Sequence, residues 1–410
     1  MIGASSYADD DEDERIKDRE KEVKKKEREE KKKAKAAEKA RKRAVKGQEK
    51  NGKNEPDDGI SDEEDEKDDE DEDDYFKSKP QKKSSYFVST VGKHFAELSS
   101  GMELLPLKLL GKKPKKFERF TASDGSSYDV PAKWNEKYLD LFLDDAKKAG
   151  VKVRFHLLVC PEMSPDWFFF RDYDTASHLV GKAEMTARLE WYIRTVTDYI
   201  FDWEYKHNQG KRLVTSYDVV SELFTDTEEL NLTLHNFLLK IYGDSSYAVQ
   251  SFGFVARNVP SSVKLCYCEH SLFDPGKAGR VKDFIRSVRS AGGRSRVDEI
   301  GIISHLTADW PERDAFFGAC KDFSSFGVDV QIQQLDIASR TGKDSGTAYY
   351  DFLKACIGHS AYIQGVSFRA VKAVDRDDSV DYMRRPLFTG DYSCTVNFDR
   401  VIEASGRGYK

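Results

Sequence analysis

The sequence lacks several features that whole classes of proteins require. Six cysteines in 410 residues are too few for a disulfide scaffold, and most of them stand in apolar runs, so they leave the redox compartment open. No run of about 18 uncharged apolar residues is present, which excludes a transmembrane helix. The first residues have no basic start and no long apolar stretch, so a complete secretory signal is missing, although Ser6-Tyr7-Ala8 resembles the end of a signal-cleavage site.

Large apolar residues are almost absent from residues 1–84, which contain 24 Lys and Arg and 29 Asp and Glu. Such a segment cannot build a core. Pairs such as Glu20 and Lys24 stand four residues apart, a spacing that favours a solitary solvated helix within 15–50. The 12 acidic residues of 61–74 repel one another and favour an extended linker. We predict that residues 1–84 form a charged tail, which is either disordered or a solitary helix. Its role would be that of a spacer or of an attachment site for a protein partner. Nucleic-acid binding is not expected, because the acidic block competes for the basic one.

From Tyr86 onward, apolar runs of strand length alternate with amphipathic helical stretches. Several helical stretches end at a glycine directly before the next strand, as at Gly150 and Gly292. This alternation predicts a (β/α)8 TIM barrel over 86–410. The alternative is an open doubly wound sheet, but no Gly-x-Gly-x-x-Gly turn follows the first strand. The candidate strands lie near 90–95, 117–121, 152–159, 213–220, 263–268, 299–304, 328–336 and 362–369.

The predicted strand ends carry polar motifs, and in a barrel the chemistry belongs at those ends. The motifs are, in order, His156-Leu-Leu-Val-Cys160-Pro with a following Pro165-Asp-Trp167-Phe, then Ser216-Tyr-Asp-Val-Val-Ser-Glu222, Ile303-Ser-His305, Gln333-Gln334-Leu-Asp336 and Gly365-Val-Ser-Phe-Arg369. They resemble glycoside hydrolase family 10, the endo-β-1,4-xylanases, whose strands end in His-Thr-Leu-Val-Trp-His, Trp-Asp-Val-Val-Asn-Glu, Gln-x-His and Thr-Glu-Leu-Asp. The resemblance runs from about residue 86 to 404 and includes the closing Pro386-Leu-Phe.

The family's retaining chemistry requires two carboxylates about 5 Å apart, an acid/base and a nucleophile. By this resemblance Glu222 is the acid/base, while the nucleophile position holds Gln334. A neutral amide supplies no negative charge to an oxocarbenium-like centre and forms no glycosyl ester. We therefore predict a xylanase-like barrel that is inactive as a retaining glycosidase.

The matched sugar-binding positions have changed as well. His156 and His305 remain at matched positions, whereas Ser221 replaces an Asn and Arg369 replaces a stacking Trp. With Glu103, these four residues are the candidate substrate-binding residues. The other departures are Cys160 and Pro161 for a Trp and a His, Ile303 for a Gln, Gly101-Met-Glu-Leu-Leu105 for Glu-Asn-x-x-Lys, and Val380 for a second Trp. So many changes at one site indicate that it is rebuilt or abandoned.

Several of these residues allow two interpretations. His156 and His305 either hold ligand hydroxyls or are buried histidines satisfied by the backbone. Arg369 suits an acidic ligand such as a uronate, or it pairs with an acid of the cleft. Asp336 matches a structural Asp that supports the barrel, and Glu162 offers a second carboxylate beside Glu222 for an altered mechanism.

The segment Cys266-Tyr-Cys268-Glu-His270 resembles a metal cluster, because alternate residues of a strand share one face. The same segment matches the family's fifth strand, whose residues line the barrel, and no fourth ligand or second motif accompanies it. We predict no metal and no cofactor.

Three functions remain open. The first is a non-hydrolytic pseudoenzyme that binds or senses a β-1,4-linked plant polysaccharide or oligosaccharide. The second is a structural or interaction protein that keeps only the barrel. The third is an active endo-β-1,4-xylanase or other glycosidase that uses Glu222 with an altered mechanism. The resemblance favours a secreted or cell-surface location.

Overall fold

The computed structural model describes residues 2–5, 85–226, 230–231, 236–308, 310–338, 345–369 and 386–406, the first of these as backbone only. The predicted charged tail lies outside the described residues, apart from 2–5. None of the described helices is long and apolar enough to cross a membrane.

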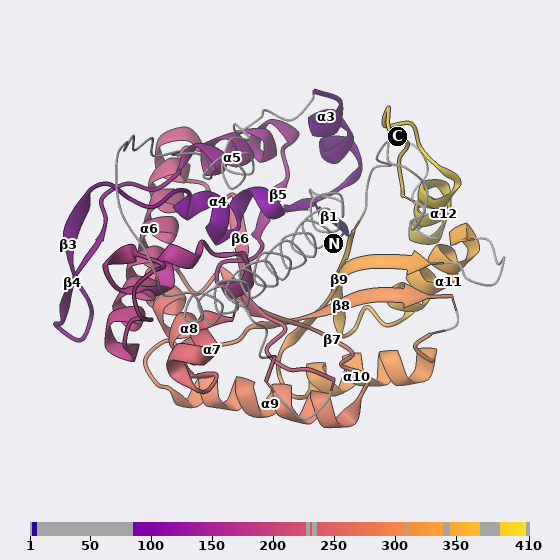
Figure 1. The fold of residues 1–410 in the computed structure, drawn as a ribbon. Helices are drawn as coiled ribbons and strands as arrows, with labels where there is room; N and C mark the ends of the chain where they lie inside the picture. The colour runs from indigo at the N-terminus through magenta and orange to yellow at the C-terminus, as the bar shows by residue number, and fades with distance from the viewer. Residues whose placement is uncertain are drawn as a thin grey trace, which may run out of the picture. The chain divides into compact units, whose positions relative to one another are not determined.

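Eight parallel strands close into a barrel, which confirms the predicted TIM fold and excludes the open sheet (Figure 1). Helices follow the strands and lie around the outside of the barrel. The barrel strands, in the order in which they pair, are β1 (Ile2–Ser5), β2 (Glu97–Ser99), β5 (Lys152–Phe155), β6 (Val214–Ser221), β7 (Lys264–His270), β8 (Glu299–Thr307), β9 (Asp329–Ala338) and β10 (Ile363–Phe368). The α-helices are α3 (Ser85–His94), α4 (Pro106–Leu110), α5 (Lys137–Ala149), α6 (Lys182–His207), α7 (Phe237–Tyr242), α8 (Ser246–Asn258), α9 (Pro275–Ser290), α10 (Arg313–Ser325), α11 (Ser345–Gly358) and α12 (Val396–Ser405).

The start of the barrel corrects the sequence prediction. The strand expected near 90–95 is the helix α3, in which Phe87 and Val91 are buried one turn apart. That spacing is helical, and it was present in the sequence. The first barrel strand is instead β1, which pairs with both β10 and β2, so residues 2–5 belong to the barrel and not to a tail outside it.

The strand expected near 117–121 exists but lies outside the barrel. It is β3 (Phe117–Thr121), which pairs antiparallel with β4 (Ser127–Pro131) in a separate hairpin. Four of its five residues are exposed, so it lacks the apolar face that a barrel strand must bury. The turn passes through Gly125 at φ 84°, a backbone conformation that favours glycine.

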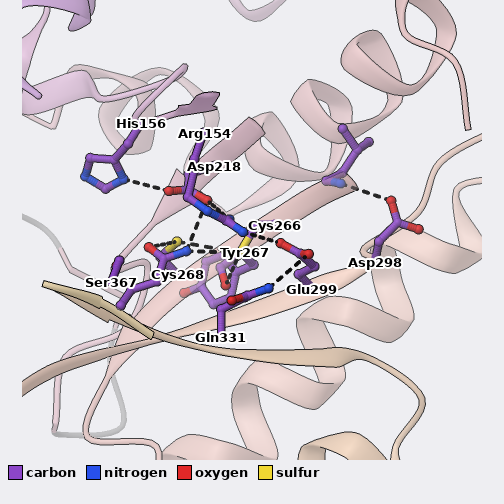
Figure 2. A network of polar contacts seen from close by, with 12 residues as sticks. Arg154, His156, Asp218, Cys266, Tyr267, Cys268, Asp298, Glu299, Gln331 and Ser367 are labelled. Carbon is purple, nitrogen blue, oxygen red and sulfur yellow. Dashed lines mark hydrogen bonds and ion pairs between the residues drawn. The ribbon is translucent and has the colours of Figure 1, made fainter. Parts of the chain in front are cut away.

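A charged network fills the middle of the barrel (Figure 2). The guanidinium of Arg154 on β5 is 2.8 Å from Oδ1 of Asp218, 2.6 Å from Oε2 of Glu299 and 3.3 Å from Oε1 of Glu97. Burial acts against the charge on Arg154, but attraction by these carboxylates outweighs it and keeps the pKa of Arg154 well above its ordinary value. This barrel is therefore held by buried ion pairs as well as by apolar side chains.

Gly301 on β8 makes room for this network. A Cβ built at Gly301 would lie 2.7 Å from Cδ of Gln333 and 2.8 Å from Sγ of Cys268. The Gln333 amide cannot withdraw easily, because it donates to Asp218 and accepts from Cys268. A side chain at position 301 therefore collides with atoms that are already held in place.

We expect Gly301→Ala to lower the free energy of unfolding by about 1–3 kcal/mol, the usual cost of overpacking a core. Gly318→Ala is the matched control, since Gly318 lies in α10, where an added Cβ would meet nothing within 4 Å. Alanine at that helical position should be neutral or add up to about 1 kcal/mol. Urea unfolding of both variants measures the difference. Equal free energies of unfolding would show that the Gln333 side chain moves aside to accommodate the added methyl group.

Candidate active site

The end of β6 presents Glu222 at the carboxyl face of the barrel. An extra residue in β6 relative to β7, near Val220, turns the strand, and Glu222 follows with φ 52°. Three successive backbone N–H groups bond this turn to β7. The N–H of Glu222 donates to the Cys268 carbonyl (2.9 Å) and that of Leu223 donates to the Tyr267 hydroxyl (3.1 Å). The N–H of Phe224 donates to Oε2 of Glu269 (3.2 Å). These bonds hold Glu222 in a backbone conformation that L-residues rarely adopt, as is common at functional sites.

The carboxylate of Glu222 contacts a charge cluster on the next strand. Its Oε1 lies 3.1 Å from Nδ1 of His270, the last residue of β7. His270 is also 3.1 Å from the buried Glu269, which pairs with the fully buried Lys277 of α9 at the same distance. Contacts with Glu222 and Glu269 raise the pKa of His270 to about 9, although burial and the Lys277 ammonium, 3.0 Å from Nε2, act against the charge.

The ionisation of Glu222 follows from these neighbours. Desolvation acts to raise the pKa of Glu222, but the contact with His270 and the smaller effects of His305 and His156 outweigh it and lower the pKa below its ordinary value. Glu222 is therefore a carboxylate at neutral pH. This pairing was not predicted from the sequence, although the segment Glu269-His270, within eight residues of Lys277, carried the signal.

The end of β9 presents Gln334. Between Gln333 and Asp336, β9 has one residue more than its neighbour β8, and Gln334 stands in this bulge with φ 51°. Its N–H donates to Oγ of Ser367 at 3.1 Å, and its side-chain Nε2 lies 3.4 Å from Nε2 of His156. The two positions matched to catalytic carboxylates therefore share the same unusual backbone conformation on different strands, although only one of them is an acid.

His156 links Gln334 to the charged network inside the barrel. Its Nδ1 lies 2.9 Å from Oδ2 of the fully buried Asp218. Burial acts to raise the pKa of Asp218, but Arg154 and the bond from His156 outweigh it, so Asp218 is ionised. Because Asp218 accepts, Nδ1 of His156 donates, which leaves Nε2 to accept from the Gln334 amide.

His305 contacts Arg369, the residue that the sequence analysis matched to a stacking Trp. Nη1 of Arg369 lies 2.7 Å from Nε2 of His305, which therefore accepts. On its other side, Nδ1 of His305 is 3.9 Å from Oδ2 of the buried Asp336. The prediction that Asp336 supports the barrel from within agrees with its burial. The structure brings both matched histidines to the same end of the barrel as Glu222 and Gln334, each with a partner that the sequence motifs did not specify.

The remaining predicted residues also lie at this end of the barrel. Ser221 is the last residue of β6, and Glu103 lies in the short turn Met102–Leu104 after β2. Glu162 is in the turn Pro161–Met163 that follows β5. Trp167 is 8% exposed and donates from Nε1 to the Gly111 carbonyl, which confirms that it packs in the core. Val380 lies outside the described residues.

Three potential metal ligands approach one another among the described residues, namely His156, Asp218 and Cys268, with one donor atom of each within 4.8 Å of the others. Each has a protein partner: Asp218 faces Arg154 and His156, and the Cys268 thiol donates to Oε1 of Gln333 at 3.4 Å. Burial raises the pKa of Cys268 and keeps the thiol protonated, whereas a metal binds the thiolate. The side chains of Cys266 and Cys268 contact Gln333, whereas His270 contacts Glu222. The predicted strand cluster is therefore divided between two networks.

Comparison with known proteins agrees with this geometry. The chain is 28% identical over 257 residues to the bifunctional endo-1,4-beta-xylanase XylA of Ruminococcus flavefaciens (62% of this chain, 26% of that protein). It is 26% identical over 293 residues to endo-1,4-beta-xylanase A of Butyrivibrio fibrisolvens (66% of each chain). The chain thus spans about a quarter of the first protein and about two thirds of the second.

Its fold matches that of the CBM22-1-GH10 modules of endo-1,4-beta-D-xylanase 10B from Clostridium thermocellum, solved with xylohexaose. The TM-score is 0.62 at 18% identity, over 80% of this chain and 64% of that one. The sequence model of glycosyl hydrolase family 10 matches residues 115–383, well over half of the chain. This span includes the ends of β5 to β10 and hence both Glu222 and Gln334, so the chain belongs to glycosyl hydrolase family 10.

Proposed function

We propose that this protein is a non-hydrolytic member of its family that binds a β-1,4-linked xylo-oligosaccharide at the carboxyl face of the barrel. The observation that carries the proposal is Gln334, a neutral amide that stands in the bulge of β9 and faces His156. Retaining hydrolysis needs a carboxylate at this point to form the glycosyl ester. An amide oxygen is a far weaker nucleophile and has no charge to stabilise the oxocarbenium-like centre.

The state of Glu222 supports the same proposal. A general acid must hold a proton at the working pH, and a second carboxylate nearby is one means of raising its pKa. Here the neighbour at position 334 is neutral, while the contact with His270 lowers the pKa of Glu222. Glu222 is therefore poorly suited to protonate a leaving group, although its half-exposed carboxylate can accept hydrogen bonds from sugar hydroxyls.

The alternative is an active glycosidase with an altered mechanism. The observation that favours it is that the fold still places Glu222 at the strand end, in a strained conformation fixed by three backbone N–H groups. Such strain is often retained where it serves chemistry. Glu222 would then act as a base that activates water, with the acid supplied by another group.

Proton NMR of xylohexaose with the purified full chain over several days separates these functions. We expect the ligand signals to broaden without new anomeric signals, because the sugar binds and its bonds stay intact. The control is Glu222→Gln, which removes the charge and keeps the shape. New anomeric signals that disappear in this variant would establish the active glycosidase. An unchanged spectrum would overturn glycan binding and favour a role in protein interactions.

A further inference from the structure

Trp310 stands half-exposed on the loop between β8 and α10, at the carboxyl face of the barrel. Its exposed fraction is 50%, whereas the neighbouring Pro311 is buried. The backbone of this loop is fixed by a bridge in which the Thr307 N–H donates to the Trp310 carbonyl at 2.9 Å and the Trp310 N–H donates back at 3.4 Å. The indole is therefore presented to solvent from an anchored backbone.

A second aromatic ring supports the indole from the neighbouring loop. Phe273 lies on the loop between β7 and α9 and is partly buried against the core. Its ring centroid is 5.0 Å from that of Trp310, with the planes at 89°, an edge-to-face pair. This contact fixes the orientation of the indole and leaves part of its surface open to a ligand.

Polar side chains stand at the ends of the two strands from which these loops leave the barrel. Phe273 comes three residues after His270, whose side chain pairs with Glu222, and Trp310 comes five residues after His305. β7 and β8 are adjacent, with His270 opposite Ile303 in the register, so both loops leave the barrel at the same side of its mouth. An apolar face beside a few fixed polar groups is the arrangement that binds small polar ligands such as sugar rings, whose C–H faces pack on aromatic side chains while their hydroxyls take the hydrogen bonds.

We infer that Trp310, braced by Phe273, is a stacking platform for one ring of a β-1,4-linked xylo-oligosaccharide. This inference rests on the proposed function. The positions that the sequence matched to the family's stacking tryptophans hold Cys160, Arg369 and Val380, so the platform has moved to the loops after β7 and β8.

The test is calorimetric titration of the full chain with xylohexaose, together with the change in tryptophan fluorescence. Trp310→Ala should weaken binding at least tenfold, roughly the effect of losing one central aromatic contact. Trp310→Phe keeps a stacking face and should bind within about threefold of the unchanged protein. Tyr205→Ala is the control, because Tyr205 is 71% exposed near the end of α6, which leads to the opposite face of the barrel.

The outcomes separate this inference from the function on which it rests. If the unchanged protein binds xylohexaose and Trp310→Ala binds equally well, the platform is refuted and glycan binding stands. If the unchanged protein does not bind, both are refuted. Equal losses in Trp310→Ala and Tyr205→Ala would also refute the platform, and the Trp310→Phe variant shows whether a loss in Trp310→Ala reflects stacking or a disturbed loop.

Discussion

Replacement of Arg154 by methionine should lower the free energy of unfolding by about 3–5 kcal/mol, the usual cost of removing one partner from a buried ion pair. Arg154 is 3% exposed and bonds to three carboxylates from three strands. Without the guanidinium, Asp218 and Glu299 face each other's negative charge in the barrel interior. Asp218 is fully buried and cannot be rehydrated without opening the barrel, whereas Glu299 lines a cavity.

Urea unfolding at neutral pH measures this loss. The matched control is Arg119→Met, which removes a surface pair with Asp129 at 3.2 Å, both side chains being about two thirds exposed. Such exposed pairs contribute at most about 1 kcal/mol. Arg154→Lys keeps the charge and loses the fork-shaped set of donors, so it should be intermediate and provides a measurement if the methionine variant does not fold.

A rescue experiment identifies the cause. Adding Asp218→Asn and Glu299→Gln to Arg154→Met removes the uncompensated charges and should recover part of the lost stability. A loss for Arg154→Met as small as that for Arg119→Met would show that the network contributes little. A triple variant less stable than Arg154→Met alone would show that the lost contacts, and not the stranded charges, carry the cost.

Gln334→Glu should leave xylan hydrolysis undetectable, at a rate several orders of magnitude below that of a competent retaining enzyme, the scale on which loss of a catalytic nucleophile acts. The new carboxylate would restore the missing group, but the rest of the site is organised for an amide. Gln334 Nε2 donates to Nε2 of His156, whereas a carboxylate only accepts, so Nε2 of His156 would have to donate instead.

Two other features keep this variant inactive. His305 accepts from Arg369 at 2.7 Å and cannot at the same time donate from that nitrogen to a carboxylate. Glu222 remains paired with His270, which favours its ionised form. One substitution therefore supplies a carboxylate, while Glu222 keeps its contact with His270 and His305 keeps its contact with Arg369.

Reducing-sugar release from xylan and NMR of xylohexaose measure the activity of Gln334→Glu. The comparison variant is Gln333→Glu, which adds the same charge one residue earlier, inside the barrel. Robust hydrolysis by Gln334→Glu and not by Gln333→Glu would show that position 334 is the only defect and would refute a rebuilt site. Lack of activity in a well-folded Gln334→Glu variant that still binds xylohexaose supports the proposal.

Local pattern determined much of this fold. Six of the predicted strands, from the segment 152–159 to 362–369, match β5 to β10, because each is an apolar run bounded by glycine or polar residues. The strand-end motifs also located Glu222, Gln334, His156 and His305 at one end of the barrel, since parallel strands bring their carboxyl ends together. β1 was missed because it lies in the segment assigned to the charged tail, and β2 because its three residues are too few to show a period.

The sequence alone determined which residues stand at the strand ends, and it predicted one carboxylate, one amide and no tryptophan at the positions matched to the family's catalytic and stacking residues. Only the tertiary structure decided what those residues contact. The pairing of Glu222 with His270, of Arg369 with His305 and of Trp310 with Phe273 joins side chains from different strands and loops. Such contacts depend on strand register and on the bulges in β6 and β9, which no local spacing encodes, and they set both the charge of Glu222 and the position of the aromatic surface.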